Sequence, residues 1–182
     1  MIDVAGPIRD WDHVARAWVV AHRPAPLDAV MWTLSAVGRG GMVWLAAGAA
    51  IAWRRSRWPD FVALAIAIAL ALIVADDVLK PIVHRTRPFD TAPAAPVIGG
   101  RPHDASFPSG HAANAFAGAT ILSTTAPAAR VAWWSLAAAI AYSRVYLGVH
   151  YPLDVIGGAL IGVCCAMFAG ALRHRLARRR PS

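Results

Sequence analysis

The chain has 182 residues, of which 58% are hydrophobic and 15% are charged, and its formal net charge is +8. A soluble domain averages about 45–50% apolar and about 25% charged residues, so this composition favours a membrane protein, and the length predicts one domain over 1–182. The basic residues cluster beside apolar runs, at 54–58 and 173–180. That distribution is typical of cytoplasmic membrane edges and argues against a nucleic-acid-binding module, which needs a basic face on a soluble domain.

Residues 1–26 are predicted to form a helix that lies in the membrane interface. Trp11 and Trp18 are mixed there with charged residues such as Asp12 and Arg16. Large apolar and charged side chains in one short helix suit a position along the bilayer surface rather than across it.

The segment 27–172 is predicted to be a transmembrane core, because it contains five apolar stretches. Crossing about 30 Å of hydrocarbon takes roughly 20 mostly apolar residues. The predicted spans are 27–53, 61–79, 112–126, 131–142 and 153–172. The GRGG sequence at 38–41 interrupts the first, and six spans are an alternative if this break or the N-terminal helix supplies another. The predicted fold class is therefore an all-α polytopic transmembrane bundle of five to six spans.

The two basic clusters predict how this bundle is oriented. The positive-inside rule places 54–57 and the tail 173–182 in the cytoplasm. Alternation of the spans then places the polar segment 80–109 on the outer side, together with the turn that follows residue 142. Four basic residues break the rule by lying in this outer segment, namely Lys80, Arg85, Arg87 and Arg101. Anion binding is one explanation, and for Arg85, Arg101 and the nearby Asp104 a solvated loop surface is an equally good one.

Three segments with ionisable residues fall on this predicted outer face. They read KPIVHRTRP at 80–88, FPSGH at 107–111 and SRVYLGVHYPLD at 143–154. Arginine forks and a lysine ammonium can hold the charge of a phosphate. A helix that begins after Ser109 would add backbone N–H groups and the positive end of its dipole. The three segments together therefore predict a phosphate site.

The histidines of these segments predict the chemistry. Asp154 lies in the first turn of a helix that begins at Pro152, where it can accept the imidazole N–H of His150. This fixes the tautomer and leaves the other nitrogen free to attack phosphorus, while His111 can protonate the leaving oxygen. The predicted reaction is phosphoryl transfer to histidine, followed by hydrolysis of the phosphohistidine. We expect no metal and no cofactor, because side chains supply the cations.

These three segments resemble the signature of the type 2 phosphatidic acid phosphatase (PAP2) superfamily, which includes the vanadium haloperoxidases and bacterial acid phosphatases. The family pattern is a lysine, six residues and Arg-Pro; then Pro-Ser-Gly-His; then Ser-Arg, five residues, His, three residues and Asp. The chain matches every position and spacing. The resemblance covers residues 76–162.

The resemblance implies a haloperoxidase-like core and a role for each motif residue. The implied roles are phosphate binding by Lys80, Arg87, Ser109, Gly110 and Arg144, acid catalysis by His111, nucleophilic attack by His150 and orientation of His150 by Asp154. Membrane-embedded members hydrolyse lipid phosphates without metal, often at the outer face. The stretch 143–158 resembles bacterial undecaprenyl-diphosphate phosphatases in particular, which implies a bacterial-type inner membrane with the site on its extracytoplasmic side.

Two further carboxylates, Asp76 and Asp77, interrupt an apolar run three and four residues before Lys80. Ionisable groups in such a run are costly and invite a functional interpretation. The spacing allows an ion pair that aims the Lys80 ammonium at the phosphate, so both are possible supporting residues.

Several functions are compatible with these motifs. The leading hypothesis is hydrolysis of an isoprenoid diphosphate of the undecaprenyl or decaprenyl type, with membrane lipids as the other partners. Alternatives are a phosphatidic acid, phosphatidylglycerophosphate or polyprenyl-phosphosugar phosphatase. A non-catalytic lipid-binding or transport protein is the alternative from another class. The intact His111, His150 and Asp154 argue against it, because a binder needs only the cations. The oligomeric state is left open.

Overall fold

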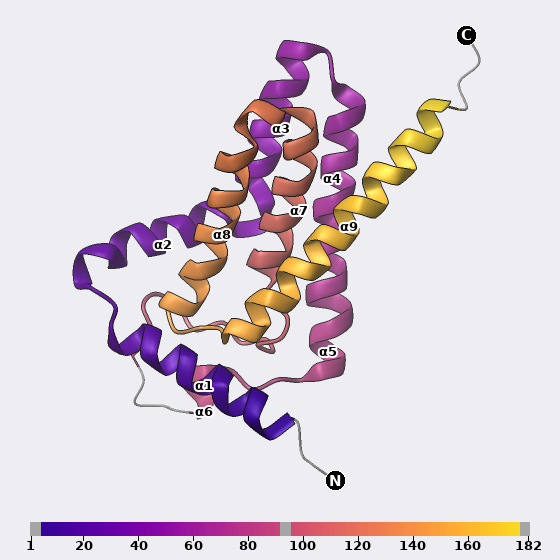
Figure 1. Ribbon diagram of the computed structural model, residues 1–182. Coiled ribbons are helices and arrows are strands. Elements are labelled where there is room, and N and C mark those ends of the chain that lie inside the picture. The colour runs from indigo at the N-terminus through magenta and orange to yellow at the C-terminus, as the bar shows by residue number, and fades with distance from the viewer. Residues whose placement is uncertain (1–4, 92–95, 179–182) are drawn as a thin grey trace.

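The computed structural model describes residues 5–91 and 96–178, which form helices and no strand (Figure 1). This confirms the all-α class for that part of the chain. The elements are α1 (Ala5–Ala21), η1 (Ala25–Leu27), α2 (Asp28–Val37), η2 (Arg39–Gly41), α3 (Met42–Arg55), α4 (Trp58–Leu72), the π-helical turn η3 (Ile73–Leu79), α5 (Lys80–Val83), α6 (Pro88–Thr91), α7 (Gly110–Thr125), η4 (Pro127–Ala129), α8 (Arg130–Tyr146) and α9 (Pro152–Arg178).

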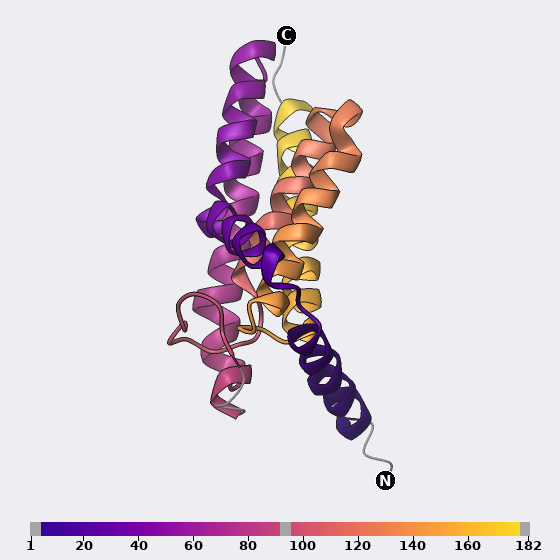
Figure 2. The same cartoon turned by 90° about the vertical axis from the view of Figure 1, so that its left-hand side faces the viewer.

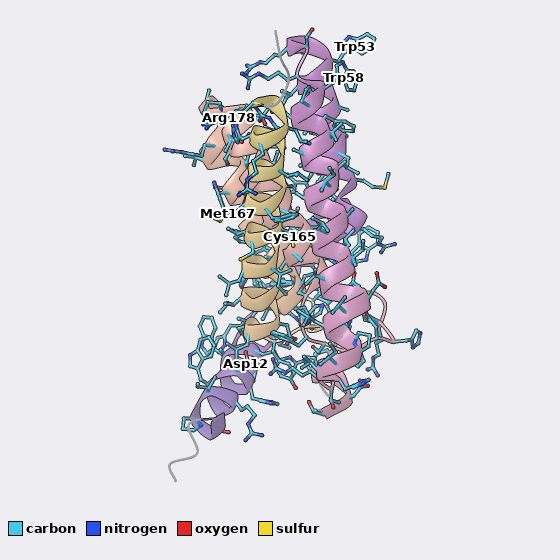
Figure 3. All side chains as sticks on the ribbon, turned by 90° about the vertical axis from the view of Figure 1, so that its right-hand side faces the viewer. Asp12, Trp53, Trp58, Cys165, Met167 and Arg178 are labelled. Atoms are coloured by element: carbon cyan, nitrogen blue, oxygen red, sulfur yellow. The ribbon has the colours of Figure 1, made fainter. Side chains whose placement is uncertain are left out.

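The long helices form one bundle, with α7 packed against α4, α8 and α9 (Figures 1 and 2). The loops that carry the three motif segments gather at one end, beside α1, α5 and α6. The α3–α4 turn and the C-terminal end of α9 lie at the opposite end, where Figure 3 labels Trp53, Trp58 and Arg178. The motif segments and the basic clusters are thus at opposite ends of the bundle, as the predicted topology requires.

Glycines bring α7 and α9 into backbone contact. A Cβ atom on Gly158 would lie 2.3 Å from the Ser109 carbonyl oxygen, and one on Gly162 would lie 2.2 Å from the Ala113 carbonyl oxygen. Small residues at such spacing let helices approach closely in membranes. The approach lets the Ser109 N–H donate to the Asp154 carbonyl oxygen at 2.9 Å, so two motif segments are joined directly.

The GRGG sequence bends the helical path rather than simply interrupting a span. Gly40 and Gly41 have φ values of 60° and 75°, a left-handed conformation that glycine adopts without steric cost. The segments on either side, Ala25–Val37 and Arg39–Arg55, meet at 52°. This bend directs α2 away from the bundle axis and lets Ser35 reach Arg144.

The number of spans stays a prediction. By length and composition, two helical stretches in the described residues can cross a membrane, Trp58–Thr91 and Pro152–Arg178, and the bent pair around GRGG makes a third if it is one span. Helices α7 and α8 have 16 and 17 residues, fewer than the roughly 20 of a full crossing. The predicted N-terminal helix corresponds to α1, residues 1–4 lie outside the described residues, and its place in the interface is untested.

The glycine contact between α7 and α9 can be tested by adding single methyl groups. Gly162→Ala should lower the thermal unfolding midpoint in detergent by several degrees, because the new Cβ meets a backbone oxygen and overpacking costs about 1–3 kcal/mol. Gly170→Ala on the same helix is the control, since a Cβ there has no neighbour within 4 Å. Equal midpoints for the two variants would contradict the close approach.

Candidate active site

The first motif segment follows a π-helical turn. Lys80 comes directly after η3, and its side chain is buried. His84 ends α5 in the left-handed conformation with φ 48°, which turns the chain so that Arg87 also becomes buried. π-Helical turns occur frequently at functional sites, and here the turn places the ammonium of Lys80 near the guanidinium of Arg87.

The second motif segment begins α7 as predicted. The Ser109 hydroxyl accepts the Ala112 N–H at 3.4 Å and so caps the helix. A Cβ atom on Gly110 would lie 2.7 Å from Oδ1 of Asp76. The glycine therefore makes room for a carboxylate, which in turn contacts Nζ of Lys80 at 2.6 Å.

The third motif segment places the predicted nucleophile against its carboxylate. Nδ1 of His150 lies 3.4 Å from Oδ2 of Asp154, a long contact of the kind that often tightens only when substrate binds. The same Oδ2 accepts the Tyr151 N–H at 2.9 Å. Both residues are buried, and α9 begins at Pro152 as the sequence predicted.

The other ring nitrogen of His150 faces a cation. Its Nε2 lies 3.4 Å from Nη1 of Arg87, which donates to the Val149 carbonyl at 2.8 Å. Burial, together with the charges of Arg87 and Arg144, lowers the pKa of His150 to about 4, against the raising effect of Asp154. The imidazole is therefore neutral near pH 7, so one nitrogen keeps the lone pair that nucleophilic attack requires.

A carboxylate from the polar loop joins the first two predicted phosphate ligands. Asp104 contacts Nζ of Lys80 and, at 2.6 Å, Nη2 of Arg87. Burial alone would raise the pKa of Asp104, but the hydrogen bond and charge of Lys80, together with Arg87, lower it to about 2. The sequence offered a solvated surface as an equally good explanation for Asp104, whereas the structure gives it a place between the two cations.

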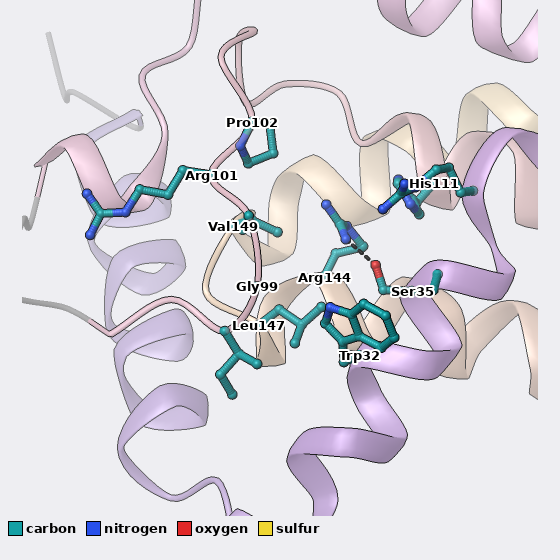
Figure 4. Close-up of a pocket in the computed structure, with 13 residues that line it drawn as sticks. Trp32, Ser35, Gly99, Arg101, Pro102, His111, Arg144, Leu147 and Val149 are labelled. Atoms are coloured by element: carbon teal, nitrogen blue, oxygen red, sulfur yellow. Dashed lines mark hydrogen bonds between the residues drawn. The ribbon is translucent and has the colours of Figure 1, made fainter.

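The third cation, Arg144, faces a cavity of about 310 Å³ together with His111 (Figure 4). Its Nη1 donates to the Ser35 hydroxyl, and its Nε is buried without a hydrogen-bond partner among the described residues. Figure 4 shows Trp32 and Ser35 of α2 beside Arg144, with His111 on the neighbouring helix. An unpaired donor on a buried arginine leaves capacity for an anion.

The structure thus brings the predicted residues to one end of the bundle. Asp76 forms the expected ion pair with Lys80, whereas Asp77 is exposed and lies outside this pairing. The motif pattern contained no signal for several contacting residues that belong to other parts of the chain. Those residues are Asp12, Ser35, Arg39, Asp104 and Ser106, together with Arg85, which lies at a position of the first segment that the family pattern leaves open.

Comparison with known proteins identifies the family. The sequence model of the PAP2 superfamily matches residues 60–178. The chain belongs to the PAP2 superfamily. An undecaprenyl-diphosphatase of Sulfolobus acidocaldarius is 36% identical over 76% of the chain, which spans just under two thirds, 66%, of that relative. A decaprenylphosphoryl-5-phosphoribose phosphatase of Mycolicibacterium smegmatis is 37% identical over 80% of the chain and 78% of the relative.

Solved structures agree with this assignment. A PAP2-type phosphatidylglycerolphosphate phosphatase from Bacillus subtilis has a TM-score of 0.77 at 24% identity, covering 96% of this chain and 90% of that one. Aquifex aeolicus LpxE has a TM-score of 0.74 at 27% identity, covering 86% and 93%. At 24% identity, the likeness to the Bacillus subtilis enzyme shows only that the fold is shared. The predicted family is confirmed, and the predicted enzyme class, a phosphatase, is that of the named relatives.

The low pKa of His150 predicts how stability changes with pH. Unfolded histidine titrates near 6.5, whereas folded His150 titrates near 4. The unfolded state therefore binds more protons between these values, and His150 lowers the free energy of unfolding by up to about 3 kcal/mol as pH falls from 6.5 to 4. His150→Asn should lose less stability across this window than wild type, measured by thermal unfolding in detergent.

The exposed His174 supplies the control, as His174→Asn should follow the wild-type curve. A constant difference between His150→Asn and wild type from pH 7 to pH 4 would show that His150 is not held neutral.

Proposed function

We propose that the chain is a metal-independent lipid phosphatase that hydrolyses an isoprenoid diphosphate through a phosphohistidine intermediate. The observation that carries this proposal is the setting of His150. One ring nitrogen faces Asp154 and the other faces Arg87, beside a cavity whose lining includes three further arginines and His111. A neutral, oriented imidazole next to cations is suited to attack an anionic phosphorus centre.

In the first step Lys80, Arg87 and Arg144 hold the terminal phosphoryl group. Nε2 of His150 attacks phosphorus, so an N–P bond forms while the bond to the leaving oxygen breaks. Burial and the charge of Arg144 lower the pKa of His111 to about 3, so His111 takes up its proton together with the bound headgroup, whose negative charge favours the imidazolium. It then donates that proton to the leaving oxygen. Asp154 keeps the Nδ1 proton on His150 and stabilises the positive charge that the ring acquires. Positioning and charge stabilisation supply most of the catalysis in phosphoryl transfer.

In the second step water hydrolyses the phosphohistidine. The water oxygen attacks phosphorus, the N–P bond breaks, and His111 accepts the proton of the water, which restores both histidines. Inorganic phosphate then leaves the cations. The proposal includes an extracytoplasmic position for this end of the bundle, supported by the basic residues Arg54 and Arg173 at the opposite end.

The cavity favours a diphosphate headgroup over a monophosphate. Among the described residues, its lining includes Arg39 and Arg101 besides Arg144 and contains no carboxylate. The charge of Arg39 acts on both His111 and Arg144. Arginine forks match phosphate oxygens, so Arg39 can hold the second phosphate while the first is attacked. A cavity of about 310 Å³ accommodates a headgroup, and the isoprenoid tail would lie in the bilayer.

A polyprenyl-phosphosugar is the second candidate substrate. Trp32 lines the same cavity and is half-exposed, which offers an aromatic wall for a sugar ring. The relative from Mycolicibacterium smegmatis is named for such a substrate. A substrate panel therefore contains a lipid diphosphate, the matching monophosphate and a polyprenyl-phosphosugar.

The mechanism predicts phosphate release from undecaprenyl diphosphate by purified protein in the presence of EDTA. His150→Ala should lower kcat by more than about 1,000-fold, because no nucleophile remains. Rapid quenching with lipid labelled on its terminal β phosphate should trap labelled phosphohistidine in wild type and not in His150→Ala. Arg54→Ala, at the far end of the bundle, is the matched control and should keep full activity. A wild type that needs a divalent metal, or an active His150→Ala variant, would contradict the mechanism.

The headgroup assignment predicts a change of specificity in Arg39→Ala. The variant should lose about tenfold or more in kcat/KM for the diphosphate, because it loses a charge-assisted contact to the second phosphate. Its kcat/KM for a monophosphate with the same tail should stay within about threefold. Arg54→Ala again serves as the control. Equal losses on both lipids would assign Arg39 to the first phosphate and overturn the diphosphate subsite.

A further inference from the structure

The N-terminal helix α1 carries a carboxylate that the proposed reaction does not use. Asp12 is 0% exposed, although residues of α1 on either side of it, Trp11 and Val14, are 53% and 68% exposed. The helix therefore turns Asp12 and Arg16 toward the protein, while Trp11, Val14 and Trp18 are exposed. Figure 3 places Asp12 where α1 meets the start of α9. A buried carboxylate in such a place requires partners that compensate its charge.

The first partner of Asp12 is the backbone at the start of α9. Its Oδ1 accepts the Leu153 N–H at 2.8 Å. This N–H belongs to the first turn of α9, where helix N–H groups have no partner within the helix. A carboxylate is also favoured there by the helix dipole. Asp12 thereby caps α9 from another helix, at the residue next to Asp154.

The second partner of Asp12 is Arg85, which also contacts the carboxylate of Asp154. Nη2 of Arg85 donates to Oδ2 of Asp12, and Nη1 donates to Oδ1 of Asp154 at 2.7 Å. The guanidinium lies over the Tyr151 ring, 4.2 Å from its centroid. One arginine fork thus joins a carboxylate of α1 to the carboxylate that faces His150.

As a result, the two carboxylate oxygens of Asp154 have different partners. Oδ1 is taken by Arg85, while Oδ2 accepts from Ser106 at 2.5 Å and lies toward Nδ1 of His150. The contact with Arg85 prevents rotation of the carboxylate away from the imidazole. The negative charge of Asp12 offsets the charge of Arg85, so Asp154 keeps more of its strength as an acceptor for the His150 N–H.

A second contact from α1 holds the other side of the His150 loop. Arg16 is buried and donates to the Gly148 carbonyl at 3.3 Å. Gly148 precedes His150 by two residues, and its φ of 81° marks the turn that leads to the histidine. Helix α1 therefore binds the chain before His150 through Arg16 and after it through Asp12.

We propose that Asp12 and Arg85 are positioning residues for the His150–Asp154 pair, so that α1 is part of the catalytic centre. The inference rests on the proposed roles of His150 and Asp154. Neither Asp12 nor Arg85 is assigned to the substrate; both act through the carboxylate that orients the nucleophile. Removal of Asp12 leaves the full charge of Arg85 on Asp154, which weakens its hold on the Nδ1 proton.

The test is Asp12→Asn, which keeps the size of the side chain and its acceptor for the Leu153 N–H but removes the charge. The matched control is Asp10→Asn, on the exposed side of the same helix. With undecaprenyl diphosphate as substrate, Asp12→Asn should lower kcat about tenfold or more and change KM by less than about twofold. Asp12→Glu, which restores the charge, should recover part of the lost kcat, and Asp10→Asn should match wild type.

A second measurement tests the positioning role of Asp12 without substrate turnover. ¹⁵N NMR of histidine-labelled protein at pH 7 reports which ring nitrogen of His150 carries the proton, with His150→Asn used to assign the signal. Wild type and Asp10→Asn should hold the proton on Nδ1, whereas Asp12→Asn should show a mixture of tautomers. The thermal unfolding midpoint of each variant is measured in the same detergent.

The outcomes separate this inference from the proposed function. Wild-type kcat and an unchanged tautomer in Asp12→Asn would overturn the positioning role. A fall in kcat that only follows a lower fraction of folded protein, with the tautomer unchanged, would also overturn it. A wild type that hydrolyses no member of the substrate panel would refute the proposed function, and the NMR comparison would then decide the positioning role alone.

Discussion

The site depends on the backbone contact between α7 and α9. Gly158 lies against the Ser109 carbonyl, and the Ser109 N–H donates to the Asp154 carbonyl. This contact joins the N-terminal turns of two helices, one of which carries His111 and the other Asp154. A side chain at Gly158 would separate them, because the nearest atom is a backbone oxygen that cannot move alone. The geometry of the proposed phosphate site is thus set by the packing of these two helices.

The basic residues around that contact differ in how far carboxylates neutralise them. Lys80 and Arg87 are held by Asp104, and Arg85 is held between two buried carboxylates. Arg144 instead has a neutral serine as its partner and opens onto a cavity whose lining, in the part of the chain that the structure describes, has no carboxylate. Buried charges are costly unless they are paired. An anionic headgroup would therefore gain the most binding energy beside Arg144, whose charge is the least neutralised. This asymmetry supports a proposal in which the substrate enters beside Arg144.

Much of the fold and of the site was predictable because the signals are local. The cap at Ser109, the start of α9 at Pro152 and the spacing of His150 and Asp154 each involve neighbouring residues. Helix boundaries were less predictable. The stretch 27–53 became two helices that meet at 52°, since glycine permits a bend without specifying its angle. The predicted helix over 1–26 is α1 from Ala5 to Ala21, and its inward charged face depends on partners elsewhere in the chain.

By itself, the sequence determined the all-helical class, the PAP2 family and the residues of the three motifs, because spacing along a helix or turn encodes their chemistry. Only the tertiary structure decided that Arg85 joins Asp12 to Asp154, that Asp104 joins Lys80 to Arg87, and that Ser35 contacts Arg144. The physical reason is distance along the chain. Asp12 and Leu153 are 141 residues apart, and only packing determines which buried charge meets which partner.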